Sequence, residues 1–193
     1  MDKKRCTWCM GDPLYIAYHD TEWGVPIYDD RLLFEFLILE GMQAGLSWFT
    51  VLKKRPAFRA AFSNFAAEKI VKYDQRKINS LLNDAGIIRN KLKIAATIQN
   101  AKAFLAIQEE SGSFSNYIWH FVNDRPIQNN QNNSHPLPSQ TIISETMSKE
   151  LKKKGFNFVG STICYAYMQA VGMVNDHVID CYRHKELVST GFK

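Results

Sequence analysis

The stretch KKKGFNFVG at residues 152–160 decides the predicted fold. A segment with apolar residues at helical spacing precedes it from residue 144, and another follows it and ends near Gly172. Two helices joined by a short hairpin that glycines bound, after a lysine run, are typical of a helix–hairpin–helix. We therefore predict this module over residues 144–172. Such a module offers the backbone N–H groups at the start of its second helix to a DNA phosphate.

The same pattern also fits an ordinary corner between two helices, in which the lysines are only solvated. Under the DNA-binding interpretation, the candidate contacts in this segment are Lys153, Gly155 and Gly160. The chain has 24 Lys and Arg residues against 19 Asp and Glu residues, a net charge of +5. This excess permits nucleic-acid binding without requiring it.

Helical periodicity continues outward from this module. Apolar residues surround the helix that we expect after Asp30, its predicted N-cap, so this helix should be central. Ser47 is the predicted N-cap of the next helix, which we expect to end before Pro56. No stretch alternates apolar and polar residues well enough for a strand. We predict an all-α protein, one unit over residues 1–193, with further helices at residues 74–85 (closed by Gly86), 92–108 and about 114–122.

Residues 124–141 interrupt the periodicity with asparagines, glutamines and prolines. We predict a polar connecting loop there and assign it no chemistry. The composition, 46% hydrophobic and 22% charged, excludes a disordered chain. No apolar run is long enough for a membrane span, and none follows the N-terminus as a secretory signal would. We expect no membrane partner, a cytoplasmic setting and reduced cysteines.

Cysteine and histidine residues near the two ends of the chain form a candidate metal site. His177 and Cys181 are four residues apart, so both face one side of a helix. With Cys6 and His19 they would complete a tetrahedral zinc site that clasps the termini. A rival set replaces His19 with Cys9, because Cys6 and Cys9 form a C-x₂-C pair. A third interpretation treats the cysteines as small hydrophobic residues.

Glu40 is the candidate ligand-binding carboxylate. It follows an apolar helical stretch, where burying a carboxylate is costly, and Gly41 and Gly45 allow the close approach of a ligand. A carboxylate among aromatic rings suits a flat guest that is cationic or bears an amine. Alternatively, the rings belong to the core and Glu40 pairs with an arginine. The nearby aromatic residues are Tyr15, Tyr18, Trp23 and Trp48.

Segments that contain these residues resemble the bacterial 3-methyladenine DNA glycosylase I family, within the helix–hairpin–helix glycosylase superfamily. The resemblance runs from residue 6 to about 181 and is most specific over residues 12–26. The matching segments are CTW (6–8), DPLYIAYHD (12–20), EWGVP (22–26), LEG (39–41), QAGLSW (43–48), DAGIIR (84–89), GF (155–156), FVG (158–160), TICY (162–165) and VNDHV (174–178).

The resemblance implies a DNA repair enzyme that flips 3-methyladenine out of double-stranded DNA, hydrolyses its N-glycosidic bond and releases the free base. It implies one structural Zn²⁺ in a region formed by residues 1–25 and 173–193. The implied ligands are Cys6, His19, His177 and Cys181, and Cys9 does not match a family ligand position. It also implies a bacterial protein that is associated with the nucleoid in use, and we expect a monomer.

The resemblance also places the base pocket at Glu40, which is the candidate catalytic residue. Leu46, in the turn with Gly45, is expected to fill part of the space that the base vacates. The implied base-binding residues are Trp8, Tyr15, Tyr18, Trp23, Glu40 and Trp48. The chain has Phe158 where the superfamily hairpin usually has glycine. Because this branch is described as lacking the usual catalytic aspartate, Asp176 is not assigned a catalytic role, and no lysine is placed for a lyase reaction. The competing functions are a DNA-binding module without catalysis and a binding protein for cationic purines.

Overall fold

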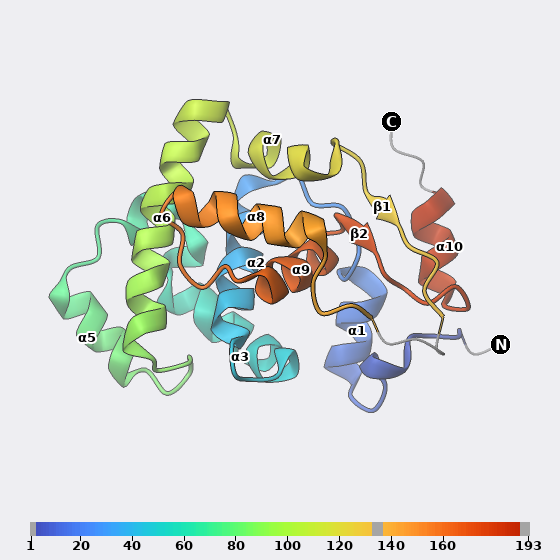
Figure 1. Cartoon of the computed structure of the whole chain (residues 1–193). Helices are drawn as coiled ribbons and strands as arrows, with labels where there is room; N and C mark the ends of the chain where they lie inside the picture. Colours follow the sequence, from blue (N-terminus) through green and yellow to red (C-terminus); the bar gives the residue numbers. More distant parts are fainter. Residues whose placement is uncertain (1–2, 133–136, 190–193) are drawn as a thin grey trace.

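The protein is described by a computed structural model that covers residues 3–132 and 137–189 (Figure 1). The predicted terminal regions and loop also include residues 1–2, 133–136 and 190–193, which lie outside the described residues. The α-helices are α1 (Pro13–Thr21), α2 (Asp30–Gln43), α3 (Trp48–Ala61), α4 (Ala67–Ile70), α5 (Gln75–Asn83), α6 (Lys91–Ser111), α7 (Phe114–Trp119), α8 (Ile142–Lys153), α9 (Ser161–Ala170) and α10 (Tyr182–Ser189). Short 3₁₀ helices are η1 (Thr7–Cys9), η2 (Ser63–Phe65) and η3 (His120–Val122). The predicted helical fold is confirmed.

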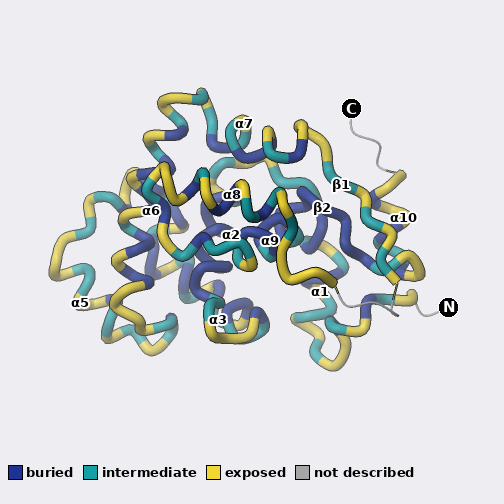
Figure 2. The backbone as a smooth tube through the Cα atoms, in the orientation of Figure 1, coloured by how far each residue is buried: buried dark blue, intermediate teal, exposed yellow. Residues whose placement is uncertain are grey.

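Helix α2 is the centre of the molecule, as its apolar sequence predicts. It contacts α3, α6, α7 and α9, and most of its residues are buried (Figure 2). Its N-cap is Asp29, whose carboxylate accepts a hydrogen bond from the N–H of Leu32, and not the predicted Asp30. The Asp30 carboxylate instead accepts hydrogen bonds from the N–H groups of Phe114 and Ser115 and so fixes the start of α7. No helix in the described part of the chain is both long and apolar enough to cross a membrane.

Two predicted helix ends are wrong. Helix α3 begins after its predicted N-cap Ser47 but continues through Pro56 to Ala61. A proline inside a helix costs about 3 kcal/mol, and the buried Phe58 and the ion pairs of Arg55 on the same helix offset this cost. Helix α5 ends at Asn83, so Gly86 is not its C-cap.

A short parallel sheet corrects the expectation of no strands. Strand β1 (Ile127–Gln128) pairs with β2 (Val174–Asn175), and Gln131 bridges to Val178 beyond them. Strands of two residues are too short to show an alternating pattern, so the sequence does not reveal them. Pairing attaches part of the predicted connecting loop to the segment that follows α9.

Helices α8 and α9 are joined by a tight hairpin, in orange and red-orange at the front of Figure 1. Gly155 has φ +92° and Phe158 has φ +55°, so phenylalanine adopts the left-handed backbone that glycine prefers. The hairpin is tied to α6, where the Asn100 amide donates to the Asn157 carbonyl and accepts from its N–H. It also touches α2, because a Cβ on Gly41 would lie 3.3 Å from the Cβ of Phe158.

Candidate active site and metal-ligand cluster

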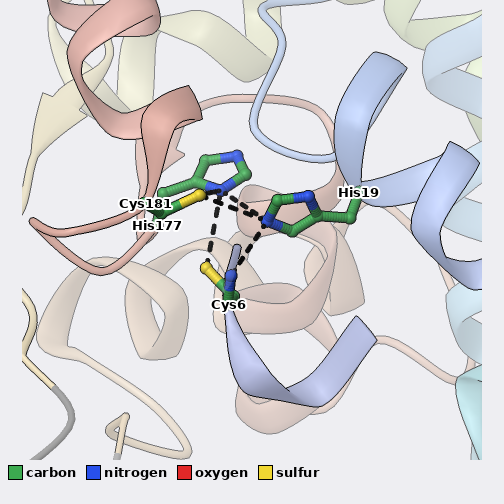
Figure 3. Close-up of side chains that lie close together, drawn as sticks. All are labelled: Cys6, His19, His177 and Cys181. Atoms are coloured by element: carbon green, nitrogen blue, oxygen red, sulfur yellow. Dashed lines mark hydrogen bonds between the residues drawn. The ribbon is translucent and has the colours of Figure 1, made fainter. Parts of the chain in front are cut away.

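The four metal ligands implied by the resemblance lie together although they come from opposite ends of the chain (Figure 3). The ligand atoms of Cys6, His19, His177 and Cys181 all lie within 4.8 Å of one another, and all four side chains are buried. His177 Nδ1 is 3.2 Å from His19 Nε2 and 3.6 Å from each of the two Sγ atoms. The Sγ of Cys181 is 3.5 Å from His19 Nε2. The cluster could hold one metal ion.

The outward-facing nitrogens of both histidines have their own partners. His19 Nδ1 lies 2.8 Å from Asp20 Oδ1, and Arg5 in turn pairs with Asp20 at 2.8 Å. His177 Nε2 lies 3.0 Å from the Trp23 carbonyl, to which it donates a hydrogen bond. These partners fix the ring orientations, so that His19 Nε2 and His177 Nδ1 face the cluster.

Cysteine chemistry distinguishes the cluster from the nearby Cys9. The hydrogen bond between the two cluster thiols raises the pKa of Cys6 and lowers that of Cys181, whose sulfur also contacts both histidines. Cys9 stands outside the cluster, and its thiol donates to the Cys6 carbonyl at 3.1 Å. Burial raises the pKa of Cys9 to about 11, which keeps it a protonated thiol. The rival set that contains Cys9 is therefore not assembled here.

Beside the cluster lies a cavity of about 260 Å³ that contains every predicted base-binding residue. Glu40, from the last part of α2, is 3% exposed, and its Oε2 has no hydrogen-bond partner among the described residues. Burial raises the pKa of Glu40 to about 8. The arginines that could have neutralised it, Arg55 and Arg59, pair with Glu35 instead. The alternative of an arginine pair for Glu40 is wrong.

Aromatic rings surround this carboxyl group. The centroids of the Tyr18 and Trp48 rings are 5.4 Å apart, and the angle between the ring planes is 47°. Like Glu40 Oε2, Trp48 Nε1 is a buried polar atom without a hydrogen-bond partner in the described structure. On the other side, the Trp8 ring lies 4.9 Å from both Tyr15 and Trp23. The Trp23 ring packs against His177 at 4.6 Å, so the metal-ligand cluster supports this wall of the cavity. The cavity is lined by Trp8, Tyr15, Tyr18, Trp23, Glu40, Gln43, Trp48, Leu137, Ala166 and Gln169.

A second cavity, of about 180 Å³, adjoins the first and shares Glu40, Gln43 and Ala166 with it. Gly45, with φ +77°, and the 44% exposed Leu46 form one side, and the first turns of α9 form the other. The remaining predicted DNA contacts, Lys153, Gly155 and Gly160, line neither cavity and lie along the hairpin instead. A larger hollow of about 620 Å³ elsewhere contains none of the predicted site residues.

Four cavity residues were not predicted from the sequence: Gln43, Leu137, Ala166 and Gln169. Thr162, Ala166 and Gln169 stand at positions i, i+4 and i+7 of α9, so helical periodicity marks one face that follows both cavities. Leu137 comes from the predicted connecting loop, where no pattern identified it. Lys93 lines neither cavity, and its ammonium donates to the carbonyls of Met42 and Ala44 at 2.8 and 2.7 Å.

A helical fold with a buried, unpaired carboxyl group in an aromatic cavity and a helical hairpin is compatible with the class of base-excising glycosylases. The methyladenine glycosylase family matches residues 8–184, and the chain belongs to this family. It is 50% identical over 178 residues to DNA-3-methyladenine glycosylase 1 of Escherichia coli strain K12, covering 92% of this chain and 95% of that protein.

Comparison with solved structures supports the same family. A crystal structure of 3-methyladenine DNA glycosylase I (TAG) superimposes with a TM-score of 0.90 at 49% identity, covering 93% of this chain and 98% of that one. A variant of 3-methyladenine DNA glycosylase I in complex with 3-methyladenine superimposes with a TM-score of 0.88 at 34% identity, covering 92% and 96%. The family resemblance found in the sequence is confirmed.

Proposed function

We propose that this protein hydrolyses the N-glycosidic bond of 3-methyladenine in alkylated double-stranded DNA, releasing the free base and leaving an abasic site. The observation that carries the proposal is the buried, unpaired carboxyl group of Glu40 in an aromatic cavity of about 260 Å³. Family membership and the 3-methyladenine bound by a structural relative support the same substrate.

The chemistry of the substrate sets what the cavity must do. Methylation makes the base cationic, so the bond between the base and C1′ breaks with its electron pair moving into the ring, and the base leaves neutral. Water then adds to C1′ and gives up a proton. The base must first leave the duplex by flipping, since the bond is otherwise inaccessible. The protein therefore needs to bind a flat cation more than to protonate a leaving group.

Glu40 meets this need through its raised pKa. In the free protein at neutral pH its carboxyl group is mainly protonated, since its pKa is about 8. A cation that enters the cavity favours the carboxylate and gains a charge-assisted hydrogen bond from its amino group. Trp48 stacks on the base, and Tyr18 completes the wall.

The hairpin and the second cavity are proposed to hold the DNA. The residues 144–172 act as a helix–hairpin–helix, in which Gly155 and Phe158 shape the turn and Gly160, the N-cap of α9, leaves the first N–H groups of α9 open to a phosphate. Leu46 fills the space that the flipped nucleotide vacates. The reaction is proposed to end at the abasic site, because no lysine of the described residues lines either cavity and Lys93 donates to two carbonyl groups outside them.

One structural Zn²⁺ is proposed for Cys6, His19, His177 and Cys181. A tetrahedral ion with Zn–S of about 2.3 Å and Zn–N of about 2.0–2.1 Å separates sulfur from nitrogen by about 3.6 Å and the nitrogens by about 3.3 Å. Three sulfur–nitrogen separations in the cluster are 3.5–3.6 Å and the nitrogen–nitrogen separation is 3.2 Å, and all four ligand atoms lie within 4.8 Å of one another. Because these four residues would supply a complete set of ligands, a bound Zn²⁺ would join the two ends of the chain. The protein is proposed to act as a cytoplasmic monomer.

The direct test measures free 3-methyladenine released from methylated DNA. We expect release by the wild type and a fall of roughly 10- to 150-fold in Glu40→Gln, the effect of about one charge-assisted hydrogen bond. Trp48→Leu should lower release by roughly 5- to 150-fold through lost stacking. Phe62→Leu removes a buried ring outside the cavities and is the matched control.

The outcome also separates the competing functions. A DNA-binding module without catalysis would bind the DNA and release nothing. A purine-binding protein would bind free 3-methyladenine and leave the DNA intact. Either result would reject the proposed function.

A further inference from the structure

Behind one wall of the base cavity lies a buried hydrogen-bond network centred on Asp176. Asp176 follows β2 and is 1% exposed. Its carboxylate accepts hydrogen bonds from Asn129 Nδ2 at 2.7 Å, from the Tyr165 hydroxyl at 2.7 Å and from Gln169 Nε2 at 2.8 Å. Of these four residues only Gln169 lines the base cavity. The network thus reaches the cavity through one side chain.

This network fixes which end of the Gln169 amide is available to a ligand. The Asp176 carboxyl oxygens take up three N–H and O–H donors, one of which is the Gln169 amide nitrogen, so the amide oxygen lies on the other branch of the amide. No hydrogen bond to Gln169 Oε1 accompanies this contact among the bonds found in the described structure. Because Gln169 lines the cavity and its amide nitrogen is bound to Asp176, the amide oxygen is the end of the side chain that remains to accept a hydrogen bond from a ligand.

The main chain holds Gln169 in place as well. Its backbone carbonyl accepts a hydrogen bond from the N–H of Gly24 at 3.0 Å, next to Trp23 in the cavity wall. Gln169 is thus attached by its backbone to the segment after α1 and by its side chain to the segment after β2. An acceptor held from two sides is oriented before the ligand arrives, so little conformational entropy is lost on binding.

We propose that Gln169 determines specificity by accepting, at Oε1, a hydrogen bond from the amino group of the base, and that Asp176 is the positioning residue that holds this oxygen toward it. The inference rests on the proposed function. Free 3-methyladenine carries its N–H donors on the exocyclic amino group, which has two of them. Glu40 accepts one and Gln169 the other. A base with a carbonyl at this position would have no N–H to donate to Gln169 Oε1 and would face this acceptor oxygen directly, which disfavours it.

Three variants test the orientation of the amide. Gln169→Met keeps the length of the side chain and removes its carbonyl oxygen. Asp176→Asn removes the carboxylate that holds the amide, so that the amide can turn its nitrogen to the cavity. The double variant Gln169→Glu with Asp176→Asn exchanges the amide and the carboxylate between the two positions. The new amide at position 176 donates to the new carboxylate at position 169, whose second oxygen remains available to the ligand. In this variant the Tyr165 hydroxyl accepts a hydrogen bond from the new amide at position 176, instead of donating one to the carboxylate there.

The measurement is calorimetric titration of each protein with free 3-methyladenine and with 3-methylpurine, which lacks the amino group. Both single variants should bind 3-methyladenine about 2- to 12-fold more weakly, the effect of one neutral hydrogen bond. The double variant should regain at least the wild-type affinity. All of the proteins should bind 3-methylpurine equally, whereas damage to the shape of the cavity would weaken both bases alike.

A matched control is available on α6. The Gln108 amide also donates to a carboxylate, that of Asp30 at 2.6 Å, but Gln108 lines neither cavity. Gln108→Met should bind both bases as the wild type does. Because Asp176 precedes a metal ligand, metal content and thermal stability are measured for each variant, and affinities are compared among folded, metal-loaded proteins.

The inference is overturned if Gln169→Met binds 3-methyladenine as tightly as the wild type. It is also overturned if both bases weaken equally or if the double variant is no better than Asp176→Asn. In each of these results the wild type still binds and releases 3-methyladenine, so the proposed function stands. A wild type that neither binds nor releases the base rejects the proposed function, and the inference with it.

Discussion

Glu40 combines burial with the lack of a charged partner, and this combination makes it responsive to pH. Its pKa is about 8 instead of the ordinary 4.5 because burial disfavours the carboxylate. By contrast Glu35, five residues earlier on α2, is fully buried but ion-paired with Arg55 at 2.6 Å. Two carboxyl groups of one helix thus have different roles: one holds the core together, and the other faces the ligand cavity.

The raised pKa predicts how stability depends on pH. The stabilising contribution of a carboxyl group with a raised pKa is complete below its unfolded value of 4.5 and is lost as pH rises to about 8. We expect the free energy of unfolding of the wild type to fall, relative to Glu40→Gln, by up to about 5 kcal/mol across this range. Urea denaturation of both proteins from pH 4.5 to 8.5 measures the difference. The exposed Glu68→Gln is the control and should follow the wild type. Parallel pH profiles for Glu40→Gln and the wild type would contradict the shifted pKa.

At the scale of the element, the hairpin depends on backbone shape more than on side chains. A Cβ on Gly160 would meet no atom within 4 Å, and Gly160 has φ −62°, which any residue adopts. Gly160→Ala should therefore fold with less than about 1 kcal/mol change in stability.

The new methyl group of Gly160→Ala would stand where a phosphate approaches the start of α9. We expect roughly tenfold weaker binding to DNA that contains an abasic site, while calorimetry with free 3-methyladenine gives an unchanged affinity. Equal DNA binding by the two proteins would remove this helix start from the interface.

The lysine run offers a second test at this scale. Lys153 pairs with Glu150 at 2.6 Å, but both side chains are exposed, and such a pair contributes little. If Lys153 contacts a phosphate, Lys153→Ala should reduce the slope of log K against log salt by about one or less. Lys102→Ala, an exposed lysine on α6, is the control. An unchanged slope would mean that Lys153 is only solvated.

At the scale of the whole molecule, the cluster of Cys6, His19, His177 and Cys181 joins the two ends. Metal binding contributes directly to folding, so Cys181→Ser should lose the metal and several kcal/mol of stability. Cys9→Ser should keep one equivalent of zinc, because Cys9 lies outside the cluster. Elemental analysis and thermal denaturation measure both effects. Zinc retained in Cys6→Ser but absent from Cys9→Ser would reverse the assignment.

Sequence patterns predicted most of the helices and five of the ten residues that line the aromatic cavity, because these are marked by periodicity or by an unusual residue type, and the family resemblance added Trp8. They did not predict that α3 continues through Pro56, since tertiary contacts of Phe58 and Arg55 outweigh the local preference. They also missed β1 and β2, which are too short to alternate.

The residues of the candidate site were likewise predicted only in part. Glu40 and Trp48 were singled out from their neighbours in the sequence. Leu137 enters the cavity from a polar loop, and Gln169 matters through its contact with Asp176, which depends on how separate segments pack. The spacing of residues along the chain indicates which of them share one face of a helix, but it does not indicate how a side-chain amide is oriented.

Because the Trp23 ring packs against His177, one wall of the cavity depends on a residue that is synthesised late. His177 follows its cluster partner His19 by 158 residues, which at about 5–20 residues per second emerge roughly 8 to 30 seconds later. By then the ribosome has already delivered all ten side chains of the base cavity. A nascent chain that stops before His177 thus contains every residue that lines the cavity but lacks the ring that packs against Trp23. We therefore expect this wall of the cavity to reach its final packing only after residue 177 has been synthesised.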